Sequence, residues 1–268
     1  MRLRTYRTEA GPRTAIVDAD GTFDAGIDGS LLAAIGAEPA RGAPVDAPPV
    51  APFRPRKNVV RAHGNYRLDD NHKRLFRRGR PFLSYYGKAP SAVNDPGAPI
   101  SWPRELAEQV CAEPQLAVIV GRTMRYVAPE DALAHVFGYA ACTDVSAEDL
   151  KRKHEQWAYG VSLDTFFCWG PDVVTADEVP DPDALTLTLE VNGAAAIEAS
   201  TADHVLSTAQ VLSELSHGIT LEPGDVVLTG VPTIAGLGSV PERWLVDGDV
   251  VRTVIGGVGE LTNEVATR

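Results

Sequence analysis

Cysteine is scarce in this chain of 268 residues and occurs only as Cys111, Cys142 and Cys168. The number is odd, and no two cysteines form a C-x-x-C pair, which excludes a zinc ribbon and a thioredoxin-type redox motif. Widely spaced single cysteines are typical of reduced thiols. We therefore expect a reducing compartment, namely the cytoplasm.

Long apolar segments are also missing. The start, MRLRTYRTEAGPR, lacks the apolar core of a signal peptide. The longest apolar stretch, around residues 116–120, is far too short to cross a bilayer. A G-x-G-x-x-G fingerprint that follows a strand and opens a helix is absent, since Gly236-Leu237-Gly238 is only a loop signal. We expect neither a membrane partner nor a dinucleotide cofactor.

Basic residues are outnumbered, and the formal net charge is -11. Phosphate binding requires a net or local basic surface, so nucleic acid is not an expected partner. One basic run breaks this pattern between Lys73 and Arg80. It fits either a solvated helix face or a feature that attracts an anionic small-molecule substrate.

The chain divides at a proline-rich segment. Residues 1–35 predict a small unit with strands at 2–7 and 14–18 and a short helix at 31–35. Prolines are dense between 36 and 57, which indicates a linker because proline sustains neither a helix nor a central strand. We predict a small N-terminal domain with its linker over 1–57 and a catalytic domain over 58–268.

Short apolar runs alternate with turn signals beyond residue 58. They predict strands at 58–61, 82–86, 116–121, 137–142, 185–191, 226–229, 250–255 and 261–265. A helix is predicted to start at Ser146 and run towards Trp157, and another to run from 202 to 217 and stop at Gly218. Many strands with few helices predict a β-rich α+β fold.

Oxygen-bearing side chains gather at two of these strands. Glu113 and Gln115 lie two residues apart, so strand geometry places both on one face. Asp144 ends a second apolar strand. Oxygen ligands from neighbouring strand ends are typical of a site for a hard divalent cation. The same residues also fit a surface pair and an aspartate at a helix entry.

Four ordered segments resemble the fumarylacetoacetate hydrolase family: EPQLAVIVGR, EDALAHVFGYAACTDVSAEDL, GVSLDTFFCWGPDVVTADEVPDPDALTLTLEVNG and LEPGDVVLTGVP. The resemblance covers about residues 58–266, and the leading MRLRTYR…GPRTAIVDADG looks like the small first domain common in that family. It implies a mixed β-roll or barrel, a homodimer, and Mg²⁺ or Mn²⁺ in the mouth of the roll. Family members act on 1,3-dicarbonyl compounds and 2-oxo acids.

The resemblance also implies site residues. The family metal is held by two glutamates and an aspartate; Glu113 and Asp144 match two of these, and Gln115 stands in place of the second glutamate. The implied substrate-binding positions are Asn65, Tyr66, Ser162, Asp164, Thr229, Gly230 and Val231.

Departures from the family pattern make the site less charged and more apolar. Gln115 removes a negative charge from the metal ligands. Val161 replaces the lysine of a G-K-S-x-D segment, so we expect that electrostatic contribution to be absent. Val231 replaces a threonine.

The family's water-activating His–Glu pair is altered as well. Asp69 occupies the histidine position and His72 the glutamate position. They fit an inverted acid/base pair in which Asp69 orients His72, or a histidine that merely titrates in solvent. His63 is a competing base.

Three hypotheses follow. The first is a metal-dependent hydrolase or lyase that cleaves or decarboxylates a C–C bond in a 1,3-dicarbonyl or 2-oxo acid substrate. The second is a metal-independent relative that cyclises, isomerises or decarboxylates an enolisable, polyketide-like substrate. The third is a non-catalytic binding protein that keeps only the scaffold.

Overall fold

The computed structural model describes residues 1–67, 76–77, 80–81, 83–231 and 243–268. The fold is β-rich with few helices, which confirms the predicted α+β class. Within the described residues, no helix is both long enough and apolar enough to cross a bilayer.

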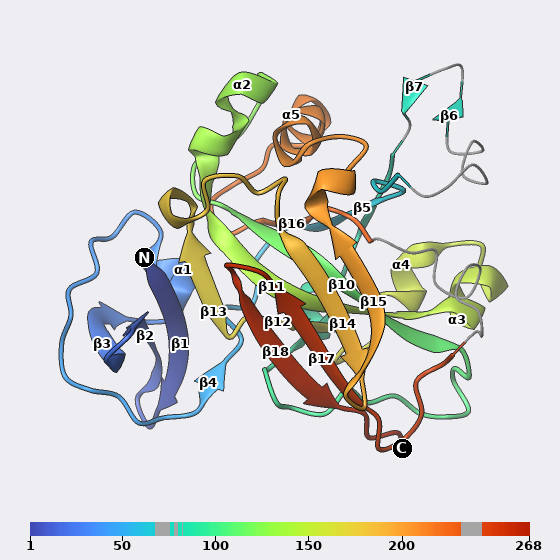
Figure 1. The fold of residues 1–268 in the computed structure, drawn as a ribbon, viewed down its shortest axis with the longest axis horizontal. Helices are drawn as coiled ribbons and strands as arrows, with labels where there is room; N and C mark the ends of the chain where they lie inside the picture. The colour runs from blue at the N-terminus through green and yellow to red at the C-terminus, as the bar shows by residue number, and fades with distance from the viewer. Residues whose placement is uncertain (68–75, 78–79, 82, 232–242) are drawn as a thin grey trace.

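Two long strands form the centre of the molecule (Figure 1). They are β10 (Val110–Val120) and β11 (Val136–Ala147), paired antiparallel along most of their length. Every residue of β10 is buried, as expected for an apolar run covered on both faces. Their register sets Glu113 directly opposite Asp144.

The large sheet follows the order β3-β2-β1-β13-β11-β10-β16-β5-β8, with β12, β9 and β4 attached beside it. Its further strands are β5 (Val59–His63), β8 (Ser84–Gly87), β9 (Val93–Asn94), β12 (Phe167–Trp169), β13 (Asp172–Thr175) and β16 (Val226–Leu228). It is mixed, because β16 and β5 run parallel while most neighbours are antiparallel. The path ends at β3 and β8, so the predicted roll is an open mixed sheet and not a closed barrel.

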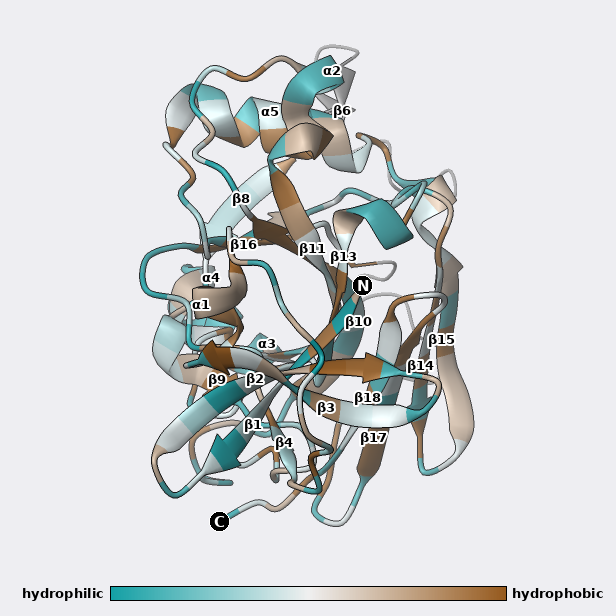
Figure 2. Cartoon of the chain, turned by 90° about the vertical axis from the view of Figure 1, so that its left-hand side faces the viewer, coloured by the Kyte–Doolittle hydropathy of each residue, from teal (hydrophilic) through white to brown (hydrophobic). Residues whose placement is uncertain are grey.

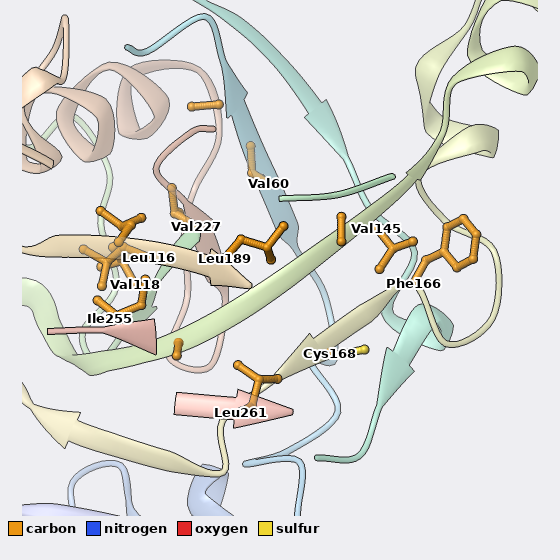
Figure 3. Packing of buried hydrophobic residues seen from close by; sticks show 14 of the residues in the cluster. Val60, Leu116, Val118, Val145, Phe166, Cys168, Leu189, Val227, Ile255 and Leu261 are labelled. Atoms are coloured by element: carbon orange, nitrogen blue, oxygen red, sulfur yellow. The ribbon is translucent and has the colours of Figure 1, made fainter. Parts of the chain in front are cut away.

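A second sheet packs against the central pair (Figure 3). Its strands are, in spatial order, β15 (Ala194–Ser200), β14 (Thr186–Val191), β17 (Val250–Ile255) and β18 (Gly259–Glu264). Leu116 and Val118 of β10 face Leu189 and Ile255 across this interface. Each such side chain contributes on the order of 1.5–3 kcal/mol when fully buried. Figure 2 shows the same division, with apolar colour on strands such as β17 and hydrophilic colour on many loops.

The N-terminal unit extends the large sheet. It comprises β1 (Arg2–Thr8), β2 (Gly11–Asp18), β3 (Gly21–Asp28), α1 (Leu31–Ala34) and β4 (Pro49–Val50). β1 pairs antiparallel with β13, and Arg2 and Arg4 both form ion pairs with Asp172 of β13. The sequence pattern missed β3, whose alternation is interrupted by Gly26 at a positive φ.

The helix predicted to start at Ser146 is wrong at its beginning. Ser146 lies on β11 opposite Cys111, and helix α3 (Glu148–Lys153) follows, then α4 (Trp157–Gly160). Ser146 with Asp149 matches a capping pattern, but pairing with β10 extends the strand through both Ser146 and Ala147. The cap residue Ala147 makes no side-chain capping hydrogen bond.

The helix predicted over 202–217 starts too early. The observed helix α5 (Thr208–Gly218) begins after Ser207, which forms a capping box with Gln210. The preceding backbone groups of Val205 and Leu206 bond to Asn65 instead. A short helix α2 (Pro129–Ala132) packs against α5.

The remaining elements are short. They are the paired strands β6 (Phe76–Arg77) and β7 (Arg80–Pro81) and the 3-10 turns η2 (Pro90–Ala92), η3 (Leu133–His135), η4 (Ala176–Glu178) and η5 (Thr201–Asp203). The basic run between residues 73 and 80 falls largely outside the described residues.

Candidate active site

One face of the large sheet changes from apolar to polar along its strands. At one end of β10 this face carries Ala117 and Ile119, which belong to a buried apolar cluster with Leu228 of β16. At the other end, the same alternation brings Gln115 and Glu113 to that face. All of these side chains are buried. The polar end of the face is the candidate active site.

The three predicted oxygen ligands do converge there. Asp144 stands opposite Glu113 in the β10–β11 register, and the Gln115 amide Nε2 donates to Asp144 Oδ2 at 2.5 Å. The carboxyl groups and the amide thus lie together in one buried region of the sheet, because paired strands align these positions side by side.

A guanidinium group lies between the two carboxylates. Arg61 of β5 is 1% exposed; its Nη1 lies 2.6 Å from Asp144 Oδ2 and its Nη2 lies 2.5 Å from Glu113 Oε2. Nη1 also donates to Ser146 Oγ at 3.2 Å, while Nε has no hydrogen-bond partner in the described part of the chain. Charge-assisted bonds of this kind are among the strongest in proteins. Arg61 is therefore the central cation of the site.

A second cation approaches Asp144 from the other side. Lys88 follows β8, is fully buried in its side chain, and sets Nζ 2.8 Å from Asp144 Oδ1. The ammonium also donates to the carbonyl oxygens of Val145 and Val161. Val161 itself carries no charge, but Lys88 brings an ammonium group to its carbonyl oxygen.

The pKa shifts follow from burial and these charges. Burial raises the pKa of the Glu113 carboxyl, and Arg61 opposes that rise. Burial alone would also raise the pKa of Asp144, but Arg61 and Lys88 outweigh it and hold that pKa below its usual range. Burial lowers the pKa of Lys88, although the attraction of Asp144 works against the change.

Gln115 is held as a donor towards the carboxylates. Its Oε1 accepts from the backbone N–H of Gly230 at 3.1 Å, which fixes the amide so that Nε2 points at Asp144. Turning the amide over would set two donors against each other at Gly230. In this arrangement Gln115 presents no oxygen to a cation beside Asp144.

The residues present do not fit Mg²⁺ or Mn²⁺ in this arrangement. Arg61 and Lys88 already balance the charges of Glu113 and Asp144, and a protonated Glu113 would leave an excess of positive charge. A divalent ion would meet the guanidinium at the position where it needs carboxylate oxygens. In the described part of the chain, no group of three or more His, Cys, Asp or Glu side chains could hold a metal ion.

Aromatic rings form a wall beside Arg61. His63 of β5 packs on Trp157 with ring centroids 4.6 Å apart, and Tyr86 packs on Trp157 at 5.2 Å. The Arg61 guanidinium carbon lies 5.4 Å from the Tyr86 ring centroid. His63 Nδ1 and the Tyr86 hydroxyl are buried, and within residues 1–67, 76–77, 80–81, 83–231 and 243–268 they have no hydrogen-bond partner. Buried polar atoms without partners beside a cation suit a polar ligand.

His63 is neutral in this environment. Burial, followed by the charges of Arg61 and Lys151, lowers its pKa to about 3. Burial also raises the pKa of Tyr86, so its hydroxyl keeps its proton. The wall thus offers one neutral imidazole and one neutral phenol next to a fixed positive charge.

Asn65 links backbone segments. Its Nδ2 donates to the carbonyl oxygens of Thr229 and Leu206 at 2.8 and 3.1 Å, and its Oδ1 accepts from Leu206 N at 2.9 Å. Gly230, the residue after Thr229, has a φ of +124°, and a Cβ added to it would lie 2.9 Å from Asn65 Cβ. These contacts hold the Gly230 N–H against Gln115.

Two further predicted substrate-binding residues leave hydroxyl groups without partners. The Thr229 and Tyr66 hydroxyls are buried, and none of the residues that the structure describes forms a hydrogen bond with them. Tyr66 packs edge-on against His204. Val231, the next residue after Gly230, is buried.

The remaining predicted residues are not joined to this cluster by any described contact. Ser162 Oγ accepts from the backbone N–H of Ala89 at 3.0 Å. Asp164 lines a cavity of about 260 Å³ together with Trp102 and Arg268. The predicted acid/base pair of Asp69 and His72 lies outside the described residues.

Sequence reasoning missed Arg61 and Lys88. One signal for Arg61 was present, because a charged residue stands inside an apolar strand run, and period two puts it on the same face as His63. Lys88 follows a strand end and carries no comparable signal.

This fold, with its acidic pair at the polar end of the central strands, defines a class of enzymes. Residues 58–266 match the family model described as "Fumarylacetoacetate (FAA) hydrolase C-terminal". The chain belongs to the fumarylacetoacetate hydrolase family, as its four sequence segments predicted.

Individual relatives are similar over different lengths. An oxaloacetate tautomerase of Bacillus subtilis is 34% identical over 67% of this chain, which spans 60% of that protein. A 2,4-didehydro-3-deoxy-L-rhamnonate hydrolase of a Sphingomonas species is 33% identical over 99% of this chain and 96% of that protein. The structure of a fumarylacetoacetate hydrolase from Exiguobacterium antarcticum is 35% identical, covers 100% of both chains and gives a TM-score of 0.91.

Proposed function

We propose that the protein isomerises a small enolisable oxo acid by moving a proton, with Arg61 and not a divalent metal as the central positive charge. The observation that carries this proposal is the guanidinium of Arg61 between Glu113 and Asp144. Among the three hypotheses, this arrangement favours the metal-independent enzyme.

Arg61 and Tyr86 would bind the reacting oxygen. The Arg61 Nε–H and the Tyr86 hydroxyl are buried donors without partners among the described residues, and the guanidinium carbon lies 5.4 Å from the Tyr86 ring centroid. A carbonyl oxygen that receives both donors becomes more negative as the enolate forms. Fixed donors in a site that excludes water stabilise such developing charge, typically by a factor of about 10²–10³ in rate per donor.

His63 would move the proton. In the ketone-to-enol direction, its Nδ1 takes a proton from the carbon beside the carbonyl, and the C–H electron pair forms the C=C bond. The protonated His63 then gives this proton to the former carbonyl oxygen, so His63 is neutral again, the product is an isomer and no co-reactant is consumed. His63 is unprotonated in the free site, and a bound anion would raise its basicity by offsetting Arg61 and Lys151.

Hydrolysis of a C–C bond is a second candidate. The hydrolase from Sphingomonas matches this chain over nearly its full length, whereas the tautomerase matches over two thirds. Both reactions share an enolate, and hydrolysis would additionally need an activated water. The predicted pair that would activate it, Asp69 and His72, is not among the described residues.

Oxaloacetate supplies the first test, because enol and keto forms are distinguished by ultraviolet absorbance and proton NMR. The purified protein should accelerate their interconversion in chelator, and His63→Gln and Arg61→Met should each lower the rate about 10²-fold or more. His217→Gln and Arg122→Met, both at exposed positions, serve as matched controls. Full activity of His63→Gln would exclude the proton-transfer role.

A panel of 2-oxo and 2,4-dioxo acids then separates the two reactions. Isomerisation leaves the mass of the substrate unchanged, while C–C hydrolysis releases two smaller acids detectable by mass spectrometry. Cleavage of any member with unaltered tautomer exchange would favour the second candidate.

A further inference from the structure

We infer that Arg61 is a built-in replacement for the divalent ion, held by the same carboxylates that would otherwise bind one. The inference rests on the proposed function, because it concerns the same site, and it adds that Arg61 and Gln115 belong together as one charge arrangement. It also predicts which substitutions turn the site back into a metal site.

The buried charges of the site balance one another. Glu113 and Asp144 are buried beside Arg61 and Lys88, so the ionised cluster is neutral. Charges inside a protein are tolerated only when they are paired and hydrogen-bonded. Adding a divalent ion while Arg61 stays in place would leave two uncompensated positive charges away from water. Metal binding therefore requires Arg61 to leave.

The neutral side chain of Gln115 also matches a site without a divalent ion. A glutamate at this position would give three carboxylates against two cations and leave a net negative charge, whereas glutamine keeps the cluster neutral. The glutamine amide also donates to Asp144, a bond that a carboxylate does not make. Gln115 thus matches a site whose cation is a guanidinium.

The engaged nitrogens of Arg61 determine which of its N–H groups a substrate can reach. Nη1 and Nη2 are engaged by Asp144 and Glu113, which fixes the plane of the guanidinium, while no described residue bonds to Nε. A metal ion can chelate two substrate oxygens, whereas Nε carries one N–H and can donate it to one oxygen. The site therefore suits an acid that presents one enolate oxygen to Arg61.

Manganese binding, followed by electron paramagnetic resonance, tests the inference independently of activity. The protein as purified should not deplete free Mn²⁺. The double variant Arg61→Ala with Gln115→Glu should bind it, with an affinity raised at least about tenfold. Adding Glu113→Gln to that variant should remove the gain. The exposed Arg122→Met serves as the matched arginine control and should behave like the parent protein.

Two results would overturn the inference. One is stoichiometric Mn²⁺ binding by the parent protein that disappears in Glu113→Gln. The other is a folded double variant, checked by circular dichroism, without affinity for Mn²⁺. If the double variant does not fold, the variant Arg61→Gln with Gln115→Glu decides, since glutamine keeps more of the side chain's bulk and still removes its charge. Mn²⁺ binding by that variant supports the inference, and a folded variant without binding contradicts it.

Mn²⁺ binding and tautomer exchange together distinguish a failure of the proposed function from a failure of this inference. A parent protein that neither binds Mn²⁺ nor exchanges oxaloacetate tautomers would retain the built-in cation and reject the proposed reaction. A parent protein that exchanges tautomers only with bound Mn²⁺ would reject the built-in cation and would keep tautomer exchange as the reaction, by a metal-dependent route.

Discussion

At the scale of residues, the polar cluster is held together by charges that have no access to water. Asp144 contacts Arg61, Lys88 and Gln115 at once, and each of these groups is buried. Removal of one member of such a cluster leaves its partner buried and incompletely paired. The cluster should therefore be sensitive to neutral substitutions of similar size.

Lys88→Met tests this sensitivity. The loss of the ammonium takes one counter-charge from Asp144, so we expect the free energy of unfolding to fall by on the order of 3–5 kcal/mol. Urea denaturation measures the change. Lys57→Met, which breaks an exposed pair with Glu222, should cost no more than about 1 kcal/mol. Equal stability of the two variants would contradict the role of Lys88.

His63 predicts a pH dependence of stability. Its pKa is lowered to about 3 in the folded protein, whereas an unfolded histidine has a pKa near 6.5. Between these values only the unfolded chain binds the proton. This residue therefore lowers the free energy of unfolding as pH falls from about 6.5 towards 3. In His63→Gln that contribution disappears, and its stability should decline less between pH 7 and pH 4.

Unfolding curves at several pH values compare the two proteins, with His217→Gln as a control at an exposed position. If His63→Gln and the parent protein show parallel pH profiles, the lowered pKa of His63 is not a source of acid sensitivity.

At the scale of elements, close approach of β11 and β13 joins the N-terminal unit to the centre. Gly138 of β11 faces β13, where an added Cβ would lie 2.4 Å from the Val174 carbonyl oxygen. Only glycine permits that approach without a shift of the strands. The same element continues to Asp144, so its position also affects the site.

Gly138→Ala should therefore destabilise the protein by about 1–3 kcal/mol through overpacking. Thermal unfolding measures the change. Gly218→Ala is the matched control, because nothing lies within 4 Å of the added Cβ there. A Gly138→Ala protein as stable as the control would show that the strands separate at little cost.

At the scale of the whole molecule, the N-terminal unit is part of the sheet. β1 pairs with β13, and Leu3 and Phe53 join a buried cluster with Trp169 and Val173 of the larger region. The predicted division between 57 and 58 stays a prediction, but the two parts share a continuous sheet and core. The predicted homodimer and cytoplasmic location stay predictions as well.

Removal of residues 1–57 should expose the edge of β13 and the apolar cluster, and we expect aggregation in size-exclusion chromatography. In contrast, a single cut after Arg41, whose side chain is 46% exposed, should leave the two pieces bound to each other. Separate elution of the pieces, or a monodisperse truncated protein, would contradict the shared core.

Short sequence patterns predict the elements whose structure depends on residues close together in the chain. Alternating and continuous apolar runs located most central strands, although the turn after β2 hid β3. The capping pattern at Ser146 predicted a helix where strand pairing prevails, since side-chain capping is weaker than a ladder of backbone bonds. Helix α5 was predicted, but it begins later, at the capping box of Ser207 and Gln210, while the preceding Val205 and Leu206 bond to Asn65, far away along the chain.

The sequence alone determined the family, the β-rich class and the placement of Glu113 and Gln115 on one strand face, because a strand alternates with period two. Only the tertiary structure decided what lies between those groups and Asp144. Arg61 and Lys88 arrive from separate strands, through the parallel pairing of β5 with β16 and the pairing of β8 with β5. β16 lies between β5 and β10, so the side chains of Arg61 and Lys88 reach Glu113 and Asp144 only after the sheet has assembled. No local sequence pattern encodes these contacts.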